Sequence, residues 1–188
     1  MNNDRILINR LKSFENINSN ILNIALALFG TFLLAISSKV QVPFWPVPMT
    51  MQTFVIFLIG MTYGVRLSFA TVTLYLLEGA AGLPVFASGG GLSYLFGPTA
   101  GYLYGMLFAS VAISYFANLG FSKTYFKAAF SLIIGSIIIF SFGILYLGSI
   151  IGYEKAIAAG LLPFIPSEIF KIALAVALIP TIQKIIKK

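Results

Sequence analysis

Two opposite charges stand three residues apart, Glu168 and Lys171, inside the last apolar stretch of a chain that carries few charges elsewhere. A charged side chain in hydrocarbon costs roughly 2.5–3.5 kcal/mol on insertion scales, so each of the two needs a partner. Residues i and i+3 share one face of a helix, which lets the carboxylate and the ammonium contact each other and one common ligand. The pair is predicted either to form the polar end of a ligand site or to lock two helices together as a structural ion pair.

The composition places the chain in a lipid bilayer. Of its 188 residues, 59% are hydrophobic and 9% are charged, and the mean hydropathy is +0.98. Such a chain cannot cover a soluble core with polar surface. It contains no cysteine and no histidine, which excludes disulfides, Cys/His metal sites and histidine catalysis. Its five acidic residues are scattered along the sequence, so neither a paired-carboxylate hydrolase nor a metal site is predicted.

Crossing the hydrocarbon takes about 20 apolar residues, and the sequence predicts six such spans. They lie near residues 21–38, 48–64, 67–84, 98–118, 127–150 and 164–183. We therefore expect an all-α, polytopic membrane protein whose two termini lie on the same side. Residues 1–20 are expected to form an N-terminal segment with the pattern of an interfacial helix, and residues 21–188 a single six-helix transmembrane domain.

The basic residues predict the orientation of these spans. With both termini in the cytoplasm, nine lysines and arginines fall on inner segments, and only Lys39 and Lys155 fall on outer ones. This asymmetry follows the positive-inside rule and predicts cytoplasmic termini. Because the basic residues flank spans instead of forming a patch, no nucleic acid partner is expected.

Two connections on the predicted outer side have unusual backbones. Residues 42–52 hold three prolines within six positions, which predicts a stiff, extended loop that ends at the amide of Gln52. Residues 79–91 are rich in glycine, which permits a non-helical backbone close to a ligand. No Gly-Lys-Ser/Thr follows, so this cluster is not a phosphate loop. Together with the start of the sixth span, both connections are predicted to wall one outward pocket.

Small residues indicate where helices approach each other in lipid. The fourth span carries them at every fourth position: Gly97, Gly101, Gly105 and Ala109. A second stripe in the first span consists of Ala27, Thr31 and Ala35. Two interpretations of this second stripe remain open, namely packing inside the protein and docking of a separate membrane subunit.

Four segments resemble, in order and spacing, the BioY family, the biotin-capturing substrate subunits of energy-coupling-factor transporters. These segments read PVPMTMQT at 46–53, EGAAGLPVFA at 78–87, GPTAGYL at 97–103 and PFIPSEIFK at 163–171. The resemblance runs from the first span to the end of the chain. It implies a multi-pass protein of the bacterial cell (inner) membrane that captures biotin in an outward pocket, needs no cofactor and is not an enzyme.

The resemblance also implies partners. ATP hydrolysis would come from a pair of separate ATPases, and a membrane coupling subunit would dock on the stripe of Ala27, Thr31 and Ala35. Capture of a different vitamin and an intramembrane enzyme are the alternatives to biotin transport.

Biotin offers a ureido group with two N–H donors and one carbonyl, an apolar bicyclic ring, and a valerate carboxylate. An ionised Glu168 accepts hydrogen bonds and Lys171 donates them, so the pair complements the ureido edge. The rival assignment places Lys171 on the valerate carboxylate. The remaining candidate contacts are aromatic or polar residues of the two connections: Trp45, Phe86, Tyr94, Ser88 and Gln52.

The chain departs from the family pattern in two places. Ser167-Glu168 stands where the family usually has Gly-Asp, so the carboxylate reaches one methylene further. Thr31 stands in the first-span stripe at a position where the family favours alanine, which weakens the inference that this stripe docks a partner.

Overall fold

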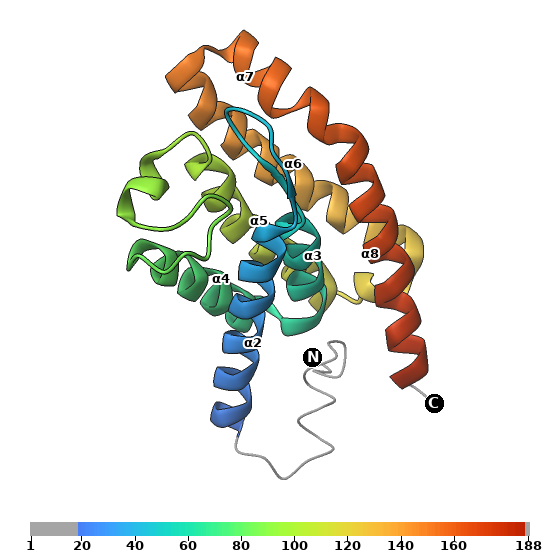
Figure 1. The fold of residues 1–188 in the computed structure, drawn as a ribbon. Helices are drawn as coiled ribbons and strands as arrows, with labels where there is room; N and C mark the ends of the chain where they lie inside the picture. The colour runs from blue at the N-terminus through green and yellow to red at the C-terminus, as the bar shows by residue number, and fades with distance from the viewer. Residues whose placement is uncertain (1–18, 187–188) are drawn as a thin grey trace.

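The computed structural model describes residues 19–186, and this part of the chain is predominantly helical (Figure 1). Its elements follow in the order α2 (Ser19–Lys39), β1 (Gln41–Val42), β2 (Met49–Thr50), α3 (Gln52–Tyr63), α4 (Val65–Ala80), η2 (Leu92–Phe96), α5 (Ala100–Asn118), η3 (Phe121–Lys123), α6 (Tyr125–Ile151), α7 (Tyr153–Gly160), η4 (Leu162–Phe164) and α8 (Ile165–Ile186). The predicted N-terminal segment lies almost wholly outside the described residues.

Each predicted span contains one helix, but the helices differ in length. Among residues 19–186, four stretches are long and apolar enough to cross a membrane: α2, α5, α6 and the stretch Tyr153–Ile179, which includes α7 and most of α8. The helices α3 and α4 have 12 and 16 residues, fewer than the ~20 that a full crossing needs. The structure therefore shows a helix at each of the six predicted positions and four candidate spans of full length.

A β-hairpin with two residues in each strand occupies part of the predicted second span, within a structure that is otherwise mostly helical, as expected. Gln41 pairs with Thr50 and Val42 with Met49, so β1 and β2 are antiparallel. The prolines between the strands cannot continue a helix, and α3 begins only at Gln52. The stiff, extended connection predicted from the prolines is thus a short hairpin, and it delivers Gln52 to the first turn of α3.

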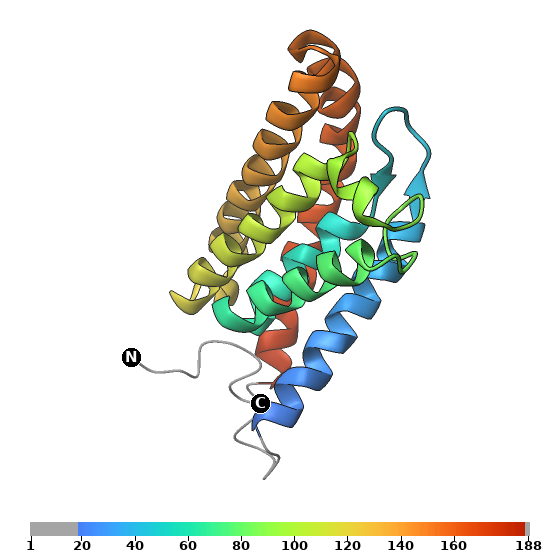
Figure 2. The same ribbon diagram turned by 90° about the vertical axis from the view of Figure 1, so that its left-hand side faces the viewer.

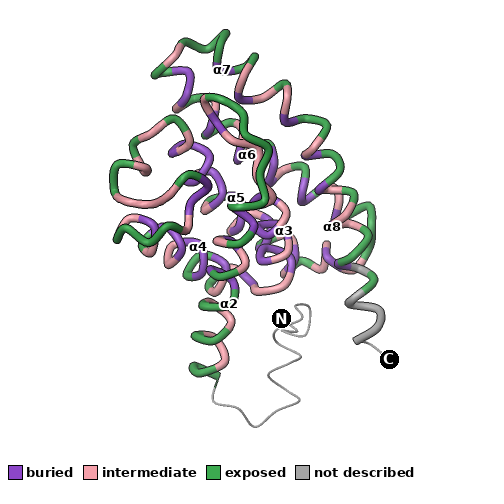
Figure 3. The backbone as a smooth tube through the Cα atoms, in the orientation of Figure 1, coloured by how far each residue is buried: buried purple, intermediate pink, exposed green. Residues whose placement is uncertain are grey.

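The helix α3 lies at the centre of the bundle. Most of its residues are buried, including Phe57, which is fully enclosed. Figure 3 shows buried positions along α3 and α5, whereas the N-terminal half of α2 is largely exposed. A single residue, Gly64, connects α3 to α4 with φ of 81°, a conformation that side chains disfavour. This tight turn folds α4 back beside α3.

The predicted glycine stripe brings α5 against α6, and the two helices lie side by side in Figure 2. A Cβ added at Gly101 would lie 2.5 Å from the backbone oxygen of Phe142, and one at Gly105 would lie 2.8 Å from the Cα of Ile139. Gly97 precedes α5 and faces no such neighbour. The close approach therefore depends on the two glycines inside the helix.

The stripe in α2 faces largely inward. Thr31 is 4% exposed and donates a hydrogen bond to the carbonyl of Leu28, while Ala35 packs against the core. The large side chains Ile24, Leu28 and Phe32 form much of the exposed surface of this helix. Of the two interpretations of the stripe, the structure therefore favours internal packing for Thr31.

The two described ends of the chain lie at the same end of the molecule. The start of α2 and the end of α8 are at one end of the molecule, while α7 and the tip of the hairpin are at the opposite end (Figures 1 and 2).

We predict that Gly101→Ala lowers the free energy of unfolding by about 1–3 kcal/mol, because the new methyl group would force α5 away from the backbone of α6. Thermal unfolding of the purified protein in detergent measures this loss. Gly97→Ala is the matched control, since its Cβ would meet nothing closer than the Tyr94 carbonyl at 3.4 Å. Equal stability of the two variants would contradict the packing role of Gly101.

Candidate functional site

The two charged residues lie in the first two turns of α8, at the junction with α3 and α6. Glu168 is 5% exposed and Lys171 is 4% exposed. Their side chains meet in an ion pair, with 3.3 Å between Lys171 Nζ and Glu168 Oε2. Burial of both charges at a three-helix junction requires further polar partners.

Two hydroxyl groups complete this polar cluster. Thr53 Oγ1, from the first turn of α3, donates to Glu168 Oε2 at 2.9 Å and accepts from Lys171 Nζ at 3.1 Å. Ser136 Oγ, from the middle of α6, donates to Glu168 Oε1 at 3.0 Å. Each carboxylate oxygen thus has a hydroxyl donor, and three helices hold the pair in place.

Some hydrogen-bonding groups of the cluster have no partner in the described part of the chain and are available to a ligand. Glu168 Oε2 uses both lone pairs on Thr53 and Lys171, whereas Oε1 uses one on Ser136 and keeps the other. Lys171 has three N–H donors and uses two, on Glu168 and Thr53. Within the described residues, one acceptor on Glu168 Oε1 and one donor on Lys171 Nζ therefore have no protein partner.

A pocket of about 520 Å³, including its open mouth, extends from these charges. As predicted, the hairpin, the glycine-rich connection and the start of α8 all contribute to its wall, through Pro48, Phe86 and Glu168 among others. The helices α5, α6 and η4 add apolar and aromatic side chains to the lining: Tyr102, Leu103, Met106, Ile139, Phe140 and Phe164.

Aromatic rings of the pocket wall support each other. Tyr102 and Phe164 stack with centroids 6.5 Å apart, and the Tyr102 hydroxyl donates to the Gly160 carbonyl at 2.8 Å. On the other side, Phe86 stacks on Tyr94 at 4.8 Å. A side chain at Gly79 would overlap the ring of Phe86, so this glycine admits Phe86 to its place.

Gln52 also lines the pocket but is committed to protein partners. Its Nε2 donates to the Tyr75 hydroxyl at 2.7 Å, and its Oε1 accepts from Thr50 Oγ1 at 3.0 Å. The Tyr75 hydroxyl in turn donates to the Val85 carbonyl at 2.9 Å. Gln52 thereby connects the first turn of α3 to the loop that carries Phe86.

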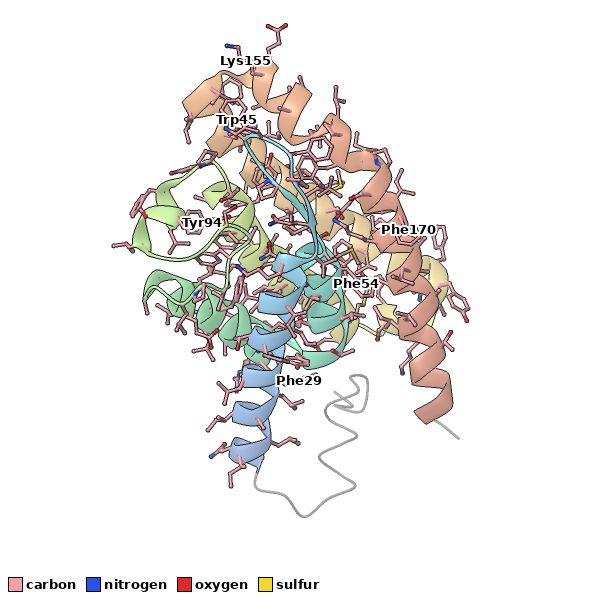
Figure 4. All side chains as sticks on the ribbon, viewed as in Figure 1. Phe29, Trp45, Phe54, Tyr94, Lys155 and Phe170 are labelled. Atoms are coloured by element: carbon pink, nitrogen blue, oxygen red, sulfur yellow. The ribbon has the colours of Figure 1, made fainter. Side chains whose placement is uncertain are left out.

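The structure does not bring Trp45 and Ser88 into this pocket. Trp45 is 85% exposed at the tip of the hairpin, where it lies near Lys155 of α7 in a separate surface hollow (Figure 4). Ser88 is exposed and is not part of the lining. In contrast, Tyr94 of η2 and Phe86 of the loop after α4 both line the pocket.

Sequence reasoning assigned no role to several residues that shape the site. Thr53 lay inside the quoted PVPMTMQT segment, next to Gln52, but only the fold shows that it faces α8. Ser136 had no distinguishing signal, because it is one of several serines in an apolar helix. Tyr102 lay inside the quoted GPTAGYL segment, and Phe164 lay four residues before Glu168.

Comparisons with known proteins agree on one family. The sequence model of the BioY family matches residues 10–188. The probable biotin transporter BioY of Rickettsia prowazekii is 32% identical over 184 residues, which cover 97% of this chain and 94% of that protein. The biotin transporter BioY of Thermotoga maritima is 33% identical over 157 residues, which cover 82% of this chain and 92% of that protein.

A solved structure shares the fold. The crystal structure of the S-component for biotin from an ECF-type ABC transporter has a TM-score of 0.78 and 24% sequence identity with this chain. The match covers 89% of this chain and 95% of the other.

We predict that Lys171→Met lowers the free energy of unfolding by about 3–5 kcal/mol, because it leaves a buried carboxylate without its cation. The double variant Glu168→Gln/Lys171→Met should recover part of this loss, since it removes both charges. Thermal unfolding in detergent measures each variant, with the exposed Lys155→Met as control. The single variant Glu168→Gln is measured as well. If the double variant lost as much unfolding free energy as the two single variants added together, the two charges would not interact.

Proposed function

The chain belongs to the BioY family, and from this premise we propose that it is the biotin-capturing substrate subunit of an energy-coupling-factor transporter. The relatives named above are biotin transporters, and the structural neighbour is an S-component for biotin. Within this chain, the observation that carries the proposal is the buried pair of Glu168 and Lys171 at the polar end of a largely apolar pocket.

The free valences of the charged cluster fit the ureido group of biotin. One ureido N–H would donate to the open lone pair of Glu168 Oε1, and the ureido carbonyl would accept the third N–H of Lys171. Both bonds are charge-assisted and would form in a site shielded from water, where such bonds are strongest. A ligand that lacks either ureido function leaves a buried group unpaired, which provides specificity.

The apolar remainder of biotin fits the rest of the wall. The fused rings would lie between the aromatic side chains that line the two sides of the pocket, with Phe86 and Tyr94 on one side and Tyr102 and Phe164 on the other. Burial of aliphatic and thioether surface against these rings contributes affinity in proportion to the area covered.

The geometry favours the ureido assignment of Lys171 over the rival carboxylate assignment. A valerate carboxylate in contact with Lys171 would approach the carboxylate of Glu168, whose Oε2 is 3.3 Å from Lys171 Nζ. Like charges at such a separation repel each other strongly in a buried site. The neutral ureido group meets no such repulsion.

The arrangement in the membrane belongs to the same proposal. The six helices α2, α3, α4, α5, α6 and α8 would cross the bacterial cell membrane in turn, with both termini in the cytoplasm and the pocket open to the outside. The common location of the two described ends and the excess of basic residues on one side support this topology.

A membrane coupling subunit and two ATPases would supply the energy. Docking on α2 would use Ala27 and Ala35, which are partly exposed, more than the buried Thr31.

We predict that the purified protein binds biotin and that Lys171→Met and Glu168→Gln each weaken binding about 10- to 150-fold. This range corresponds to the loss of one hydrogen bond to a charged group, about 1.5–3 kcal/mol. Calorimetry in detergent, with the exposed Lys155→Met as control, measures the affinities. A folded wild-type protein that does not bind biotin would refute the function.

Biotinamide, whose tail is uncharged, tests the two assignments of Lys171. If Lys171 contacts the ureido group, Lys171→Met should weaken biotin and biotinamide by the same factor. If Lys171 contacts the valerate carboxylate, the substitution should weaken biotin alone.

We predict that a membrane-impermeant maleimide labels Glu154→Cys in intact cells and labels Arg66→Cys only after the membrane is permeabilised. The chain has no cysteine of its own, so each variant presents one thiol. Both positions are exposed, Glu154 on α7 and Arg66 in the first turn of α4. The reverse labelling pattern would invert the proposed orientation.

A further inference from the structure

Side chains at the C-terminal end of α2 and in β1 form hydrogen bonds with the loop that follows α4. Three consecutive residues of this loop, 85–87, each present a carbonyl to a side chain at the end of α2 or in β1. Ser38 Oγ lies 2.8 Å from the Val85 carbonyl, Lys39 Nζ lies 2.6 Å from the Phe86 carbonyl, and Gln41 Nε2 lies 3.3 Å from the Ala87 carbonyl. Segments 46 or 47 residues apart in the sequence are thereby joined.

The contact of Lys39 is the strongest of the three. It is charge-assisted and short, whereas Ser38 divides its single hydrogen between Val85 and the Ala35 carbonyl. Lysines in the last turn of a helix commonly interact with the terminal carbonyls of that helix, yet Lys39 reaches across to another segment. Among the described residues, no carboxylate lies within ion-pair distance of Lys39.

The carbonyl that Lys39 holds belongs to a residue of the pocket wall. Phe86 is fully buried, stacks on Tyr94 and lines the pocket that ends at the charged pair. Its backbone exchanges two hydrogen bonds with Gly89, so residues 86–89 form a compact turn. The hydrogen bond from Lys39 to the Phe86 carbonyl therefore restrains the whole turn, including the Phe86 ring that lines the pocket.

We propose that Lys39 is a positioning residue for ligand capture, which acts by holding the Phe86 turn in the pocket wall. This assignment rests on the proposed function, because the ligand is taken to be biotin. Without the ammonium, the turn keeps its internal bonds but loses its strongest attachment to α2. The Phe86 turn then moves away from the pocket more often, and the dissociation rate of bound biotin rises.

The test is the dissociation rate of radiolabelled biotin from the purified full chain after addition of excess unlabelled biotin. Lys39→Met should raise the rate about tenfold, as expected for the loss of a charge-assisted hydrogen bond. Lys39→Arg should return the rate to near the wild-type value, because a guanidinium also donates to a carbonyl. Lys155→Met removes the other lysine predicted on the outer side and should leave the rate unchanged.

The unfolding midpoint without biotin separates positioning from a general structural role. It should be similar in all variants, since a single loop can open locally without global unfolding. An unchanged rate in Lys39→Met, equal acceleration in Lys155→Met, or failure of Lys39→Arg to restore the rate would each overturn the proposal. Lys39→Gln, which keeps a neutral donor and should give an intermediate rate, keeps the test decisive if Lys39→Met does not fold. Absence of biotin binding by the wild-type protein would instead refute the proposed function.

Discussion

A buried ion pair inside a membrane bundle is tolerated only while its hydrogen-bonding groups have partners. Glu168 finds them on Thr53 of α3 and Ser136 of α6, and Lys171 shares Thr53. The pair on α8 therefore determines how three helices sit relative to one another. The pocket begins where these helices meet, so the groups proposed to recognise the ligand are the same groups that join the bundle.

Glycine makes the remaining walls possible by allowing close approach. Gly101 lets α5 lie against the backbone of α6, and Gly79 leaves room for the ring of Phe86 under the loop after α4. Helices that approach closely gain dispersion contacts, which drive association in lipid, where apolar surface alone provides no preference. Rigid walls of this kind preorganise a pocket, so less ordering entropy is lost when a ligand binds.

Apolar runs in the sequence were sufficient to predict where the helices lie, and the isolated charges were sufficient to predict the buried ion pair that lines the pocket. The length of α3 could not be predicted, because residues 48–51 are apolar enough for a span yet include part of the hairpin. Ser136 could not be chosen among similar serines without knowing which face of α6 meets α8. Trp45 was predicted in the pocket because its loop borders it, but the direction of a hairpin tip depends on strand register and tertiary contacts. The small residues of the α2 stripe left both internal packing and docking open for Thr31, and only the packing of the fold shows that Thr31 is covered.

The unequal helix lengths bear on the surrounding lipid. The 16 residues of α4 rise about 24 Å and expose Phe69 and Leu77, whereas the 27 residues of α6 rise about 40 Å. In the proposed six-span arrangement, a hydrocarbon layer of about 30 Å would be too thick for the first and too thin for the second. Such hydrophobic mismatch is relieved by local thinning of the bilayer or by tilt of the protein, each at modest cost. The unequal lengths would then couple the inclination of the protein to membrane thickness, and lipid composition would become a variable of its behaviour.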